Sequence, residues 1–236
     1  MQPNAVGVQE VLNKALSTVL RQPIETLGCG RTDTGVHAKE FFAHFTPQPP
    51  EGGVFDNSFL KNTTRALNSV LPRDIAIKKV IPVADDAHAR FDATLRSYEY
   101  HIHFNKDPFK NGYSWLLRDE PDLELMNQAA KLIMQYIDFS CFSKSNTQVK
   151  TNNCKIIHAE WGKTDGGIVF KISADRFLRN MVRAIVGTLL MVGNKEIAPE
   201  AIHDIIQSKN RSNAGTSVPA CGLYLTEVKY PYPLTP

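Results

Sequence analysis

Cysteine is scarce in this chain of 236 residues, and its placement excludes both a disulfide-rich scaffold and a cysteine-ligated zinc site. The cysteines form no CxxC pair and no short, regular framework. We therefore expect reduced thiols in a cytoplasmic protein. Long apolar runs are also missing, so the sequence predicts no membrane-spanning segment, and the first four residues do not resemble a signal peptide. The four cysteines are Cys29, Cys141, Cys154 and Cys221.

The chain likewise lacks a strong excess of charge of either sign. Its 27 lysines and arginines nearly balance 24 acidic residues, which leaves a formal net charge of +3. Overall charge therefore does not predict nucleic-acid binding, and any such function must come from a local arrangement of cations. Hydrophobic residues make up 42% of the chain, which suffices for the core of one large domain or two small ones.

Hydrophobic periodicity predicts an α+β protein with two halves, residues 1–92 and 93–236. In the first half we expect a helix over 4–20, a strand over 40–45, a loop over 47–53, a helix capped by Ser58 and ended by Pro72, and a strand over 75–83. In the second half we expect a strand over 97–104, a helix capped by Asp122, strands over 154–161 and 168–174, a long apolar helix over 176–192, a short helix over 199–208 and a last strand over 223–230.

This order of elements suggests two similar halves with antiparallel sheets, helices on the outer faces and a central catalytic cleft. The first half lacks an opening strand that would make it match the second. We therefore expect a sheet in the first half with one strand missing.

The segment Gly30–Ala38 (GRTDTGVHA) is the most informative in the chain. Asp33 lies between small and glycine residues, with Arg31 two positions before it and His37 four positions after it. A carboxylate in a tight turn beside a cation can act as a nucleophile, and His37 is either structural or a phosphate contact. The alternative is an ordinary surface turn, since these are common turn residues. The rival acids each have a simple explanation as a cap or loop residue; they are Asp92, Asp138 and Asp175.

Three arginines form the second feature. Arg176, Arg179 and Arg183 are spaced i, i+3, i+7, which would place them on one face of the long apolar helix. Such a face predicts an anion-binding surface, with phosphate as the expected anion. A solvated charged face is the alternative. Arg183 comes just before the apolar run, and we expect it to pair with Asp33.

Tyr98 opens a strand after several cations, where its ring could stack on an unpaired base. A core tyrosine on the same face as Tyr100 is the alternative. His101 and His103 share one strand face, but no third ligand has suitable spacing. We therefore expect a solvent-facing pair and no metal.

These segments together resemble the TruA family of tRNA pseudouridine synthases. The matching stretches follow the family's order along nearly the whole chain. They are GRTDTGVHA (30–38), HARFDATLRSYEYHI (88–102), DFSCFSK (138–144), FLRNMVRAIVGTLLMVG (177–193) and GLYLTEVKY (222–230).

The resemblance implies that uridine is isomerised to pseudouridine at positions 38 to 40 of the tRNA anticodon stem-loop. It implies no cofactor and no metal, and a homodimer that binds tRNA. By position, Asp33 matches the catalytic aspartate, Arg183 its arginine partner and Tyr98 the substrate-stacking tyrosine. Arg31 matches the arginine of the nucleophile motif, and Leu223 an aliphatic residue of the site. Whether the carboxylate attacks C1′, removes the 2′ proton or adds to C6 of the base stays open.

Members of the family carry a strand and turn before the first helix, which this chain lacks, so the missing first strand is expected from the resemblance as well. An inactive, shortened RNA-binding protein is therefore an alternative function. Asp33-Thr34-Gly35 is also the triplet of aspartic proteases, but these need a second such aspartate. A neighbouring arginine would also prevent two carboxylates from sharing a proton.

Overall fold

A computed structural model describes residues 6–49, 54–143 and 151–234. The start of the first expected helix, the end of the loop expected over 47–53, and Lys144 of the DFSCFSK stretch lie outside these residues. Contacts divide the chain into two compact units. Unit 1 comprises Met1–Gly30, Phe42–Ala93 and Tyr230–Pro236, and unit 2 comprises Arg31–Phe41 and Thr94–Lys229. No helix in the described part of the chain is both long and apolar enough to cross a membrane.

The expected division after residue 92 lies next to one of these boundaries, but the motif segment does not stay with the N-terminal half. Arg31–Phe41 groups with unit 2. The reason is a short strand in this segment, β2 (His37–Ala38), which pairs with the last strand of the chain, β8 (Leu223–Lys229). The nucleophile candidate therefore belongs to the larger unit.

Unit 1 packs two helices over a small sheet. Its elements are α1 (Val8–Leu20), α2 (Asn57–Val70) and the antiparallel pair β1 (Leu27–Gly28) and β3 (Ala43–His44). Leu16 of α1 and Leu67 of α2 are almost fully buried in one apolar cluster. Both helices form as predicted, but Asp56 rather than Ser58 caps α2, because its carboxylate accepts the N–H of Phe59 at 2.7 Å.

The strand expected over 75–83 is absent, although this segment is described throughout. Its backbone bonds to side chains of α2 and not to a neighbouring strand. The amide of Asn68 donates to Ile77 O at 2.8 Å and accepts from Ile77 N at 2.7 Å, and Val80 N donates to Thr64 Oγ1 at 3.2 Å. An extended segment with alternating apolar residues satisfies its hydrogen bonds here without a sheet.

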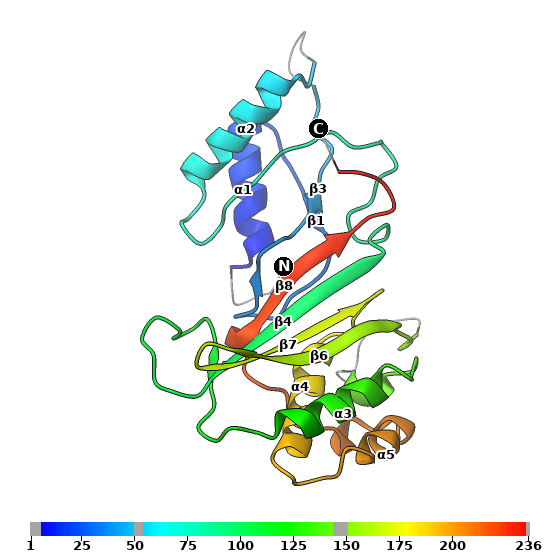
Figure 1. Cartoon of the computed structure of the whole chain (residues 1–236). Coiled ribbons are helices and arrows are strands. Elements are labelled where there is room, and N and C mark those ends of the chain that lie inside the picture. The colour runs from blue at the N-terminus through cyan, green and yellow to red at the C-terminus, as the bar shows by residue number, and fades with distance from the viewer. Residues whose placement is uncertain (1–5, 50–53, 144–150, 235–236) are drawn as a thin grey trace. The chain divides into compact units, whose positions relative to one another are not determined.

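Unit 2 is built on a six-stranded sheet in the order β2-β8-β4-β7-β6, with β5 beside β4 (Figure 1). The long strands pair antiparallel, as expected, whereas β2 with β8 and β5 with β4 are parallel. The α+β class is thus confirmed. The described units are nevertheless dissimilar, since unit 1 has a two-stranded sheet and unit 2 a mixed one. The remaining strands are β4 (Leu95–His103), β5 (Trp115–Leu116), β6 (Ile156–Thr164) and β7 (Gly167–Ala174).

Three helices cover one face of this sheet: α3 (Leu123–Ile133), α4 (Met181–Gly193) and α5 (Ala201–Gln207) (Figure 1). Asp122 caps α3 as predicted, accepting from Glu124 N and Leu125 N at 3.2 Å. The α4 helix is buried nearly throughout. Three single turns complete the unit: η1 (Ser140–Phe142), η2 (Arg211–Asn213) and η3 (Ala220–Gly222).

The long apolar helix starts five residues later than predicted. α4 begins at Met181, after Asn180 in the left-handed region with φ of 67°. Upstream, the Asp175 carboxylate accepts the N–H groups of Lys155 and Arg176 at 2.7 Å, which holds the chain in a loop. Arg176 and Arg179 therefore precede the helix, and the prediction that they share a helical face with Arg183 is wrong.

The Asp138 carboxylate bonds both Ser140 of η1 and Lys209, which follows α5. Because of these contacts, we expect the stability of the fold to decrease at acidic pH. Hydrogen bonds from Lys209 and from Ser140 lower the pKa of Asp138 to about 2. Because the pKa of an unfolded aspartate is about 3.9, this contribution is complete above about pH 4 and is lost as pH falls toward 2. We expect the melting temperature of Asp138→Asn to change less between about pH 4 and about pH 2 than that of the unchanged chain. Asp119→Asn, which changes an exposed carboxylate, should leave the profile as in the unchanged chain.

Candidate active site

The motif loop forms a tight turn that fixes the direction of Asp33. The carbonyl of Asp33 accepts the N–H of Val36 at 3.1 Å, and Gly35 has φ of +83°, a conformation that favours glycine. Val36 packs against the main apolar cluster. Beyond it, β2 pairs with β8, and Lys39 N donates to Leu225 O at 2.8 Å. The loop is thus fixed on its C-terminal side by the sheet.

Asp33 lies between two arginines, and the predicted ion pair is present. Arg183 Nη1 lies 3.2 Å from one carboxylate oxygen, and Arg179 Nε lies 3.6 Å from the other. The Asp33 side chain is 25% exposed, that of Arg183 19% and that of Arg179 56%. The carboxylate is therefore partly open to an incoming molecule while both its oxygens face cations.

The Arg183 side chain is held from a second direction. Its Nε donates to Val218 O at 2.7 Å, and Val218 N donates back to Arg183 O at 3.3 Å. A guanidinium that is held through two of its nitrogens loses little freedom when it acts on a ligand. The segment that carries Val218 therefore decides where Arg183 points.

That segment, residues 214–218, packs directly on α4. Gly215 N donates to Thr188 Oγ1 at 2.8 Å, and a Cβ built on Gly187 would lie 1.8 Å from Thr216 O. The Arg211 guanidinium supports the same segment, bonding Ala214 O, Gly215 O and Ser217 Oγ at 3.0–3.2 Å. No motif in the sequence indicates Arg211, because its partners are mostly backbone carbonyls.

Tyr98 and Leu223 lie on neighbouring strands of the same sheet. Tyr98 is partly buried, packs on the main cluster and meets Phe177 edge-on with ring centroids 5.2 Å apart. Leu223 is 6% exposed and pairs with Tyr100 in the sheet register. Tyr100 is fully buried and donates to Pro219 O at 2.7 Å, so it supports the segment after Val218. Burial raises the pKa of Tyr100 far above its ordinary range.

The other predicted site residues have different surroundings. Arg31 is exposed, and among the described residues the ion pairs of Asp33 are with Arg179 and Arg183, not with Arg31 or Arg176. His37 is partly buried; its Nε2 lies 2.9 Å from Gly112 O. The structure thus brings two of the three predicted arginines to Asp33, through a turn and a helix.

The rival acids have structural partners, as expected. Asp175 and Asp138 bond backbone N–H groups in loops, and Asp92 accepts from His88 N and Tyr232 Oη at 2.7 and 2.8 Å. His103 is 4% exposed, so the expected solvent-facing histidine pair is wrong for this residue. In the part of the chain that the structure describes, no group of three His, Cys, Asp or Glu residues could hold a metal ion.

The cysteine thiols remain separate in the structure. None of the four forms a disulfide, and Cys29, Cys141 and Cys154 are buried. Burial raises the pKa of the Cys141 thiol to about 12 and that of Cys154 to about 11. Such thiols are neutral near pH 7 and poor nucleophiles, so Cys141 and Cys154 do not compete with Asp33 as candidate nucleophiles.

The arrangement suits chemistry at an electron-poor carbon beside phosphates. The carboxylate can attack or accept a proton, and the arginines can stabilise negative charge on a ligand. It does not suit an aspartic protease, because such an enzyme pairs two catalytic carboxylates, whereas both oxygens of Asp33 face arginines.

Comparison with known proteins agrees with the arrangement. A family model described as tRNA pseudouridine synthase matches residues 134–231. The tRNA pseudouridine synthase A of Parabacteroides distasonis is 48% identical over 236 residues, which span 100% of this chain and 91% of that protein. Its namesake from Porphyromonas gingivalis is 49% identical over 98% of this chain and 90% of its own length. A more distant one, from Clostridium acetobutylicum, is 37% identical over 97% and 92%. Since relatives this similar align with nearly the whole chain, the chain belongs to the tRNA pseudouridine synthase A family of isomerases.

Proposed function

We propose that the chain isomerises uridine to pseudouridine in the anticodon stem-loop of tRNA, at positions 38 to 40, with Asp33 as its catalytic carboxylate. The single observation that carries the site assignment is the ion pair between Asp33 and Arg183, 150 positions apart in sequence and 3.2 Å apart in space. Family membership supports the reaction, and the motif resemblance supports the position in tRNA. The proposal includes a homodimer and no cofactor.

The reaction moves one bond and conserves all atoms. The C1′–N1 glycosidic bond breaks, a C1′–C5 bond forms, N1 gains a proton and C5 loses one. Asp33 can take part by attacking C1′, by removing the 2′ proton or by adding to C6 of the base. All three roles use a carboxylate oxygen, and both oxygens of Asp33 face guanidinium groups.

Arg183 and Tyr98 have positioning roles in this proposal. A target base must leave its stack to reach Asp33, at a cost of about a few kcal/mol. Tyr98 offers its ring to such a base, and the fixed Arg183 keeps the carboxylate in one orientation. Leu223, which is buried and pairs with Tyr100 in the sheet, is the aliphatic residue of the site in this proposal.

Pseudouridine analysis of a treated RNA tests the proposal. The purified chain is incubated with an unmodified tRNA whose anticodon stem-loop carries uridines at positions 38 to 40, and the product is digested and analysed by mass spectrometry after chemical labelling. We expect pseudouridine at these positions and nowhere else in the tRNA. Binding without any pseudouridine would favour the alternative, an inactive RNA-binding protein.

Arg176 and Arg179 should contribute to affinity through phosphate contacts. We expect tRNA affinity to fall steeply with salt, and Arg176→Ala or Arg179→Ala to weaken binding without changing which uridine is modified, since phosphate contacts carry no base information. Each change should reduce the slope of log affinity against log salt by about 1. Filter binding at several salt concentrations measures this.

Lys131→Ala is the matched control, because it removes an exposed positive charge from α3. It should leave the slope unchanged. A flat salt dependence in the unchanged protein would contradict the assignment of phosphate as the bound anion.

A further inference from the structure

The loop between β4 and β5, residues 105–114, is held in place although it projects from the end of the sheet (Figure 1). Three hydrogen bonds join it to separate parts of unit 2. Tyr224 Oη donates to Tyr113 O at 2.6 Å, and Lys110 Nζ ties the loop to Asp165 O at 3.2 Å. His37 Nε2 lies 2.9 Å from Gly112 O. The loop is therefore connected to the motif segment that carries Asp33.

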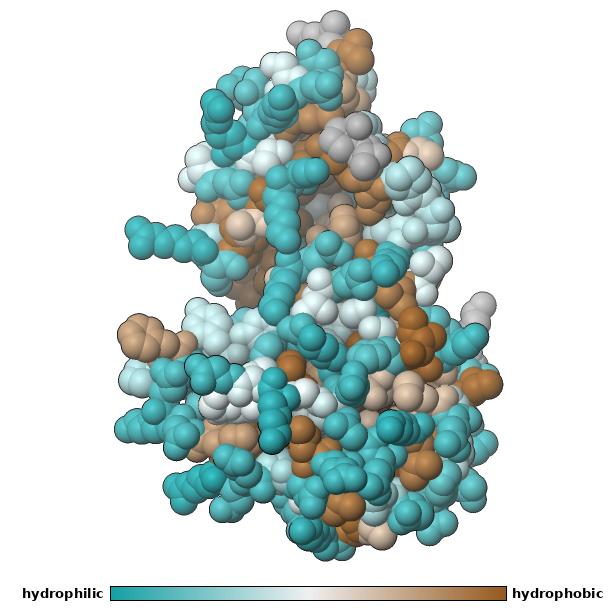
Figure 2. Space-filling view, viewed as in Figure 1, coloured by the Kyte–Doolittle hydropathy of each residue, from teal (hydrophilic) through white to brown (hydrophobic). Residues whose placement is uncertain are grey.

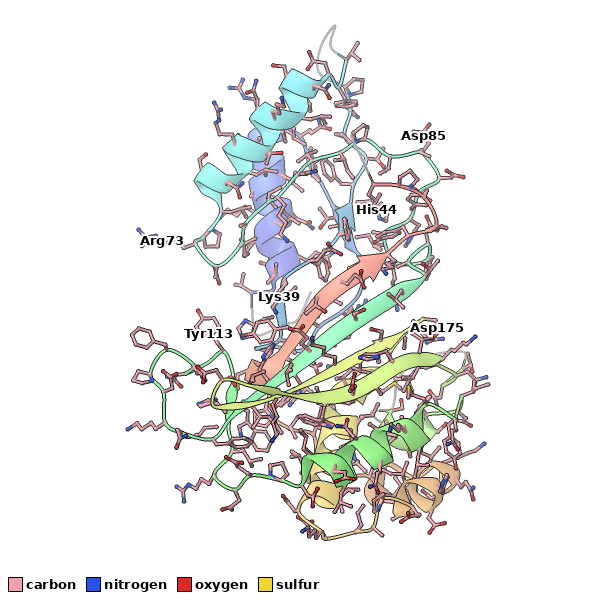
Figure 3. All side chains as sticks on the ribbon, viewed as in Figure 1. Lys39, His44, Arg73, Asp85, Tyr113 and Asp175 are labelled. Carbon is pink, nitrogen blue, oxygen red and sulfur yellow. The ribbon has the colours of Figure 1, made fainter. Side chains whose placement is uncertain are left out.

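Three rings of unit 2 form a stack at this connection. His37 lies between Tyr113 and Tyr224, with ring centroids 5.3 and 4.7 Å apart and interplanar angles of 26° and 23°. Lys39 Nζ lies 5.4 Å from the centroid of Tyr224 (Tyr113 and Lys39 are labelled in Figure 3). Tyr113 ends the stack and is 61% exposed, so the stack finishes at a ring in contact with solvent.

A second aromatic side chain of the loop is almost fully exposed. Phe109 has 92% of its surface accessible, the largest exposed fraction among the large hydrophobic side chains of the described residues. Its neighbours in the loop include two lysines, Lys106 and Lys110, and Lys39 lies at the base of the ring stack. Figure 2 shows brown side chains scattered among teal ones on this face, without a continuous brown surface over the projecting loop.

We propose that the loop 105–114 is a second RNA contact, in which Phe109 and Tyr113 stack on unpaired bases of the tRNA substrate. The inference rests on the proposed function for the identity of that substrate. Proteins bind single-stranded nucleic acids with aromatic side chains, on which the bases stack, and with nearby cations, which contact the phosphates. Lys106, which is exposed in the same loop, meets the phosphates of the same strand, and His37 positions the loop relative to Asp33.

A second copy of the chain would be the competing occupant of this surface. The core of a protein interface is contiguous, apolar and depleted of charged residues. Here Phe109 and Tyr113 are separated by Lys110, Asn111 and Gly112, and Asp107 lies 4.0 Å from Lys110 Nζ. This alternation of rings and polar groups fits a nucleic-acid strand, whose bases and phosphates also alternate.

Substitutions at Phe109 test the inference because they separate stacking from simple hydrophobic contact. We expect Phe109→Leu and Phe109→Ala to weaken tRNA binding alike, by about tenfold, because only an aromatic ring can stack. Phe109→Trp should bind as the unchanged protein does. The effect on pseudouridine formation should fall on KM and not on kcat. Ile157→Ala is the matched control, since it removes another exposed apolar side chain from unit 2.

Three results would overturn the inference. Phe109→Leu could bind like the unchanged protein, or Ile157→Ala could weaken binding as much as Phe109→Ala. Sedimentation could also show that Phe109→Leu dissociates an assembly that the Ile157→Ala control keeps, which would assign the loop to contact between copies. Failure of the proposed function would give a different result, because the unchanged protein would then form no pseudouridine. The inference about the loop is tested separately, by the tRNA affinities of the variants relative to that of the unchanged protein.

Discussion

Replacing Asp33 with asparagine should lower pseudouridine formation by about 10⁴-fold or more, because the change removes the reactive carboxylate and almost no bulk. Affinity for tRNA should stay the same or rise. The carboxylate is the anion that faces Arg179 and Arg183, and its neutralisation leaves these cations more available to phosphates. Single-turnover assays and filter binding on one preparation measure both quantities.

Asp175→Asn is the matched control for this experiment. It makes the same chemical change at another acid of unit 2, whose oxygen accepts backbone N–H groups that an amide oxygen can also accept. Its turnover should remain close to that of the unchanged protein. Equal turnover in Asp33→Asn and Asp175→Asn would refute the role assigned to Asp33.

Replacing Gly187 with alanine should destabilise unit 2 by about 3 kcal/mol, at the upper end of the usual cost of overpacking. The added Cβ would lie 1.8 Å from Thr216 O, and Gly215 in turn approaches the Gly187 backbone, so backbone must move and not a flexible side chain. The intrinsic helical preference of alanine, about 1 kcal/mol over glycine, offsets only part of this cost. At 2–4 °C per kcal/mol for a domain of this size, the melting temperature should fall by about 10 °C.

The same change should also disturb the site, because residues 214–218 fix the Arg183 guanidinium through Val218 O. We expect turnover measured well below the melting temperature to fall together with stability. Gly162→Ala is the control, since its nearest atom outside the local chain is a Val169 methyl at 4.0 Å. If Gly187→Ala melted like Gly162→Ala, the close packing of α4 on this segment would not be a determinant of stability.

The predictable elements were those whose signals are local. The α3 helix begins at its Asp122 cap because an aspartate before an apolar, periodic segment satisfies the first free N–H groups. The β4 strand follows the strict alternation of Tyr98, Tyr100 and Ile102, and β6 and β7 meet at a glycine turn. Each of these signals lies within about ten residues, and no distant contact opposes it.

The errors arose where distant groups compete for the backbone. The segment over 75–83 has the composition of a strand, but Asn68 and Thr64 of α2 satisfy its hydrogen bonds. The arginine spacing i, i+3, i+7 is a good helical pattern, yet the Asp175 carboxylate and the left-handed Asn180 delay α4 until Met181. Periodicity records which side chains prefer burial, and it does not record which partner a backbone amide finds.

The sequence by itself determined the α+β class and most of the long elements, because each depends on a repeated local pattern. It indicated Asp33 through a short motif, and it indicated the pairing with Arg183 through the place of Arg183 before the apolar run and through the family resemblance. Only the tertiary structure decided that the motif segment joins the larger unit through β2 and β8, and that Arg179 reaches the second oxygen of Asp33 from a turn. It alone also assigned Arg211 and His37 their positions, as supports of the segment behind Arg183 and of the loop that carries Phe109. The β2–β8 pairing and the positions of Arg211 and His37 rest on hydrogen bonds to backbone carbonyls, which every residue possesses, so no pattern of side chains along the chain can mark them in advance.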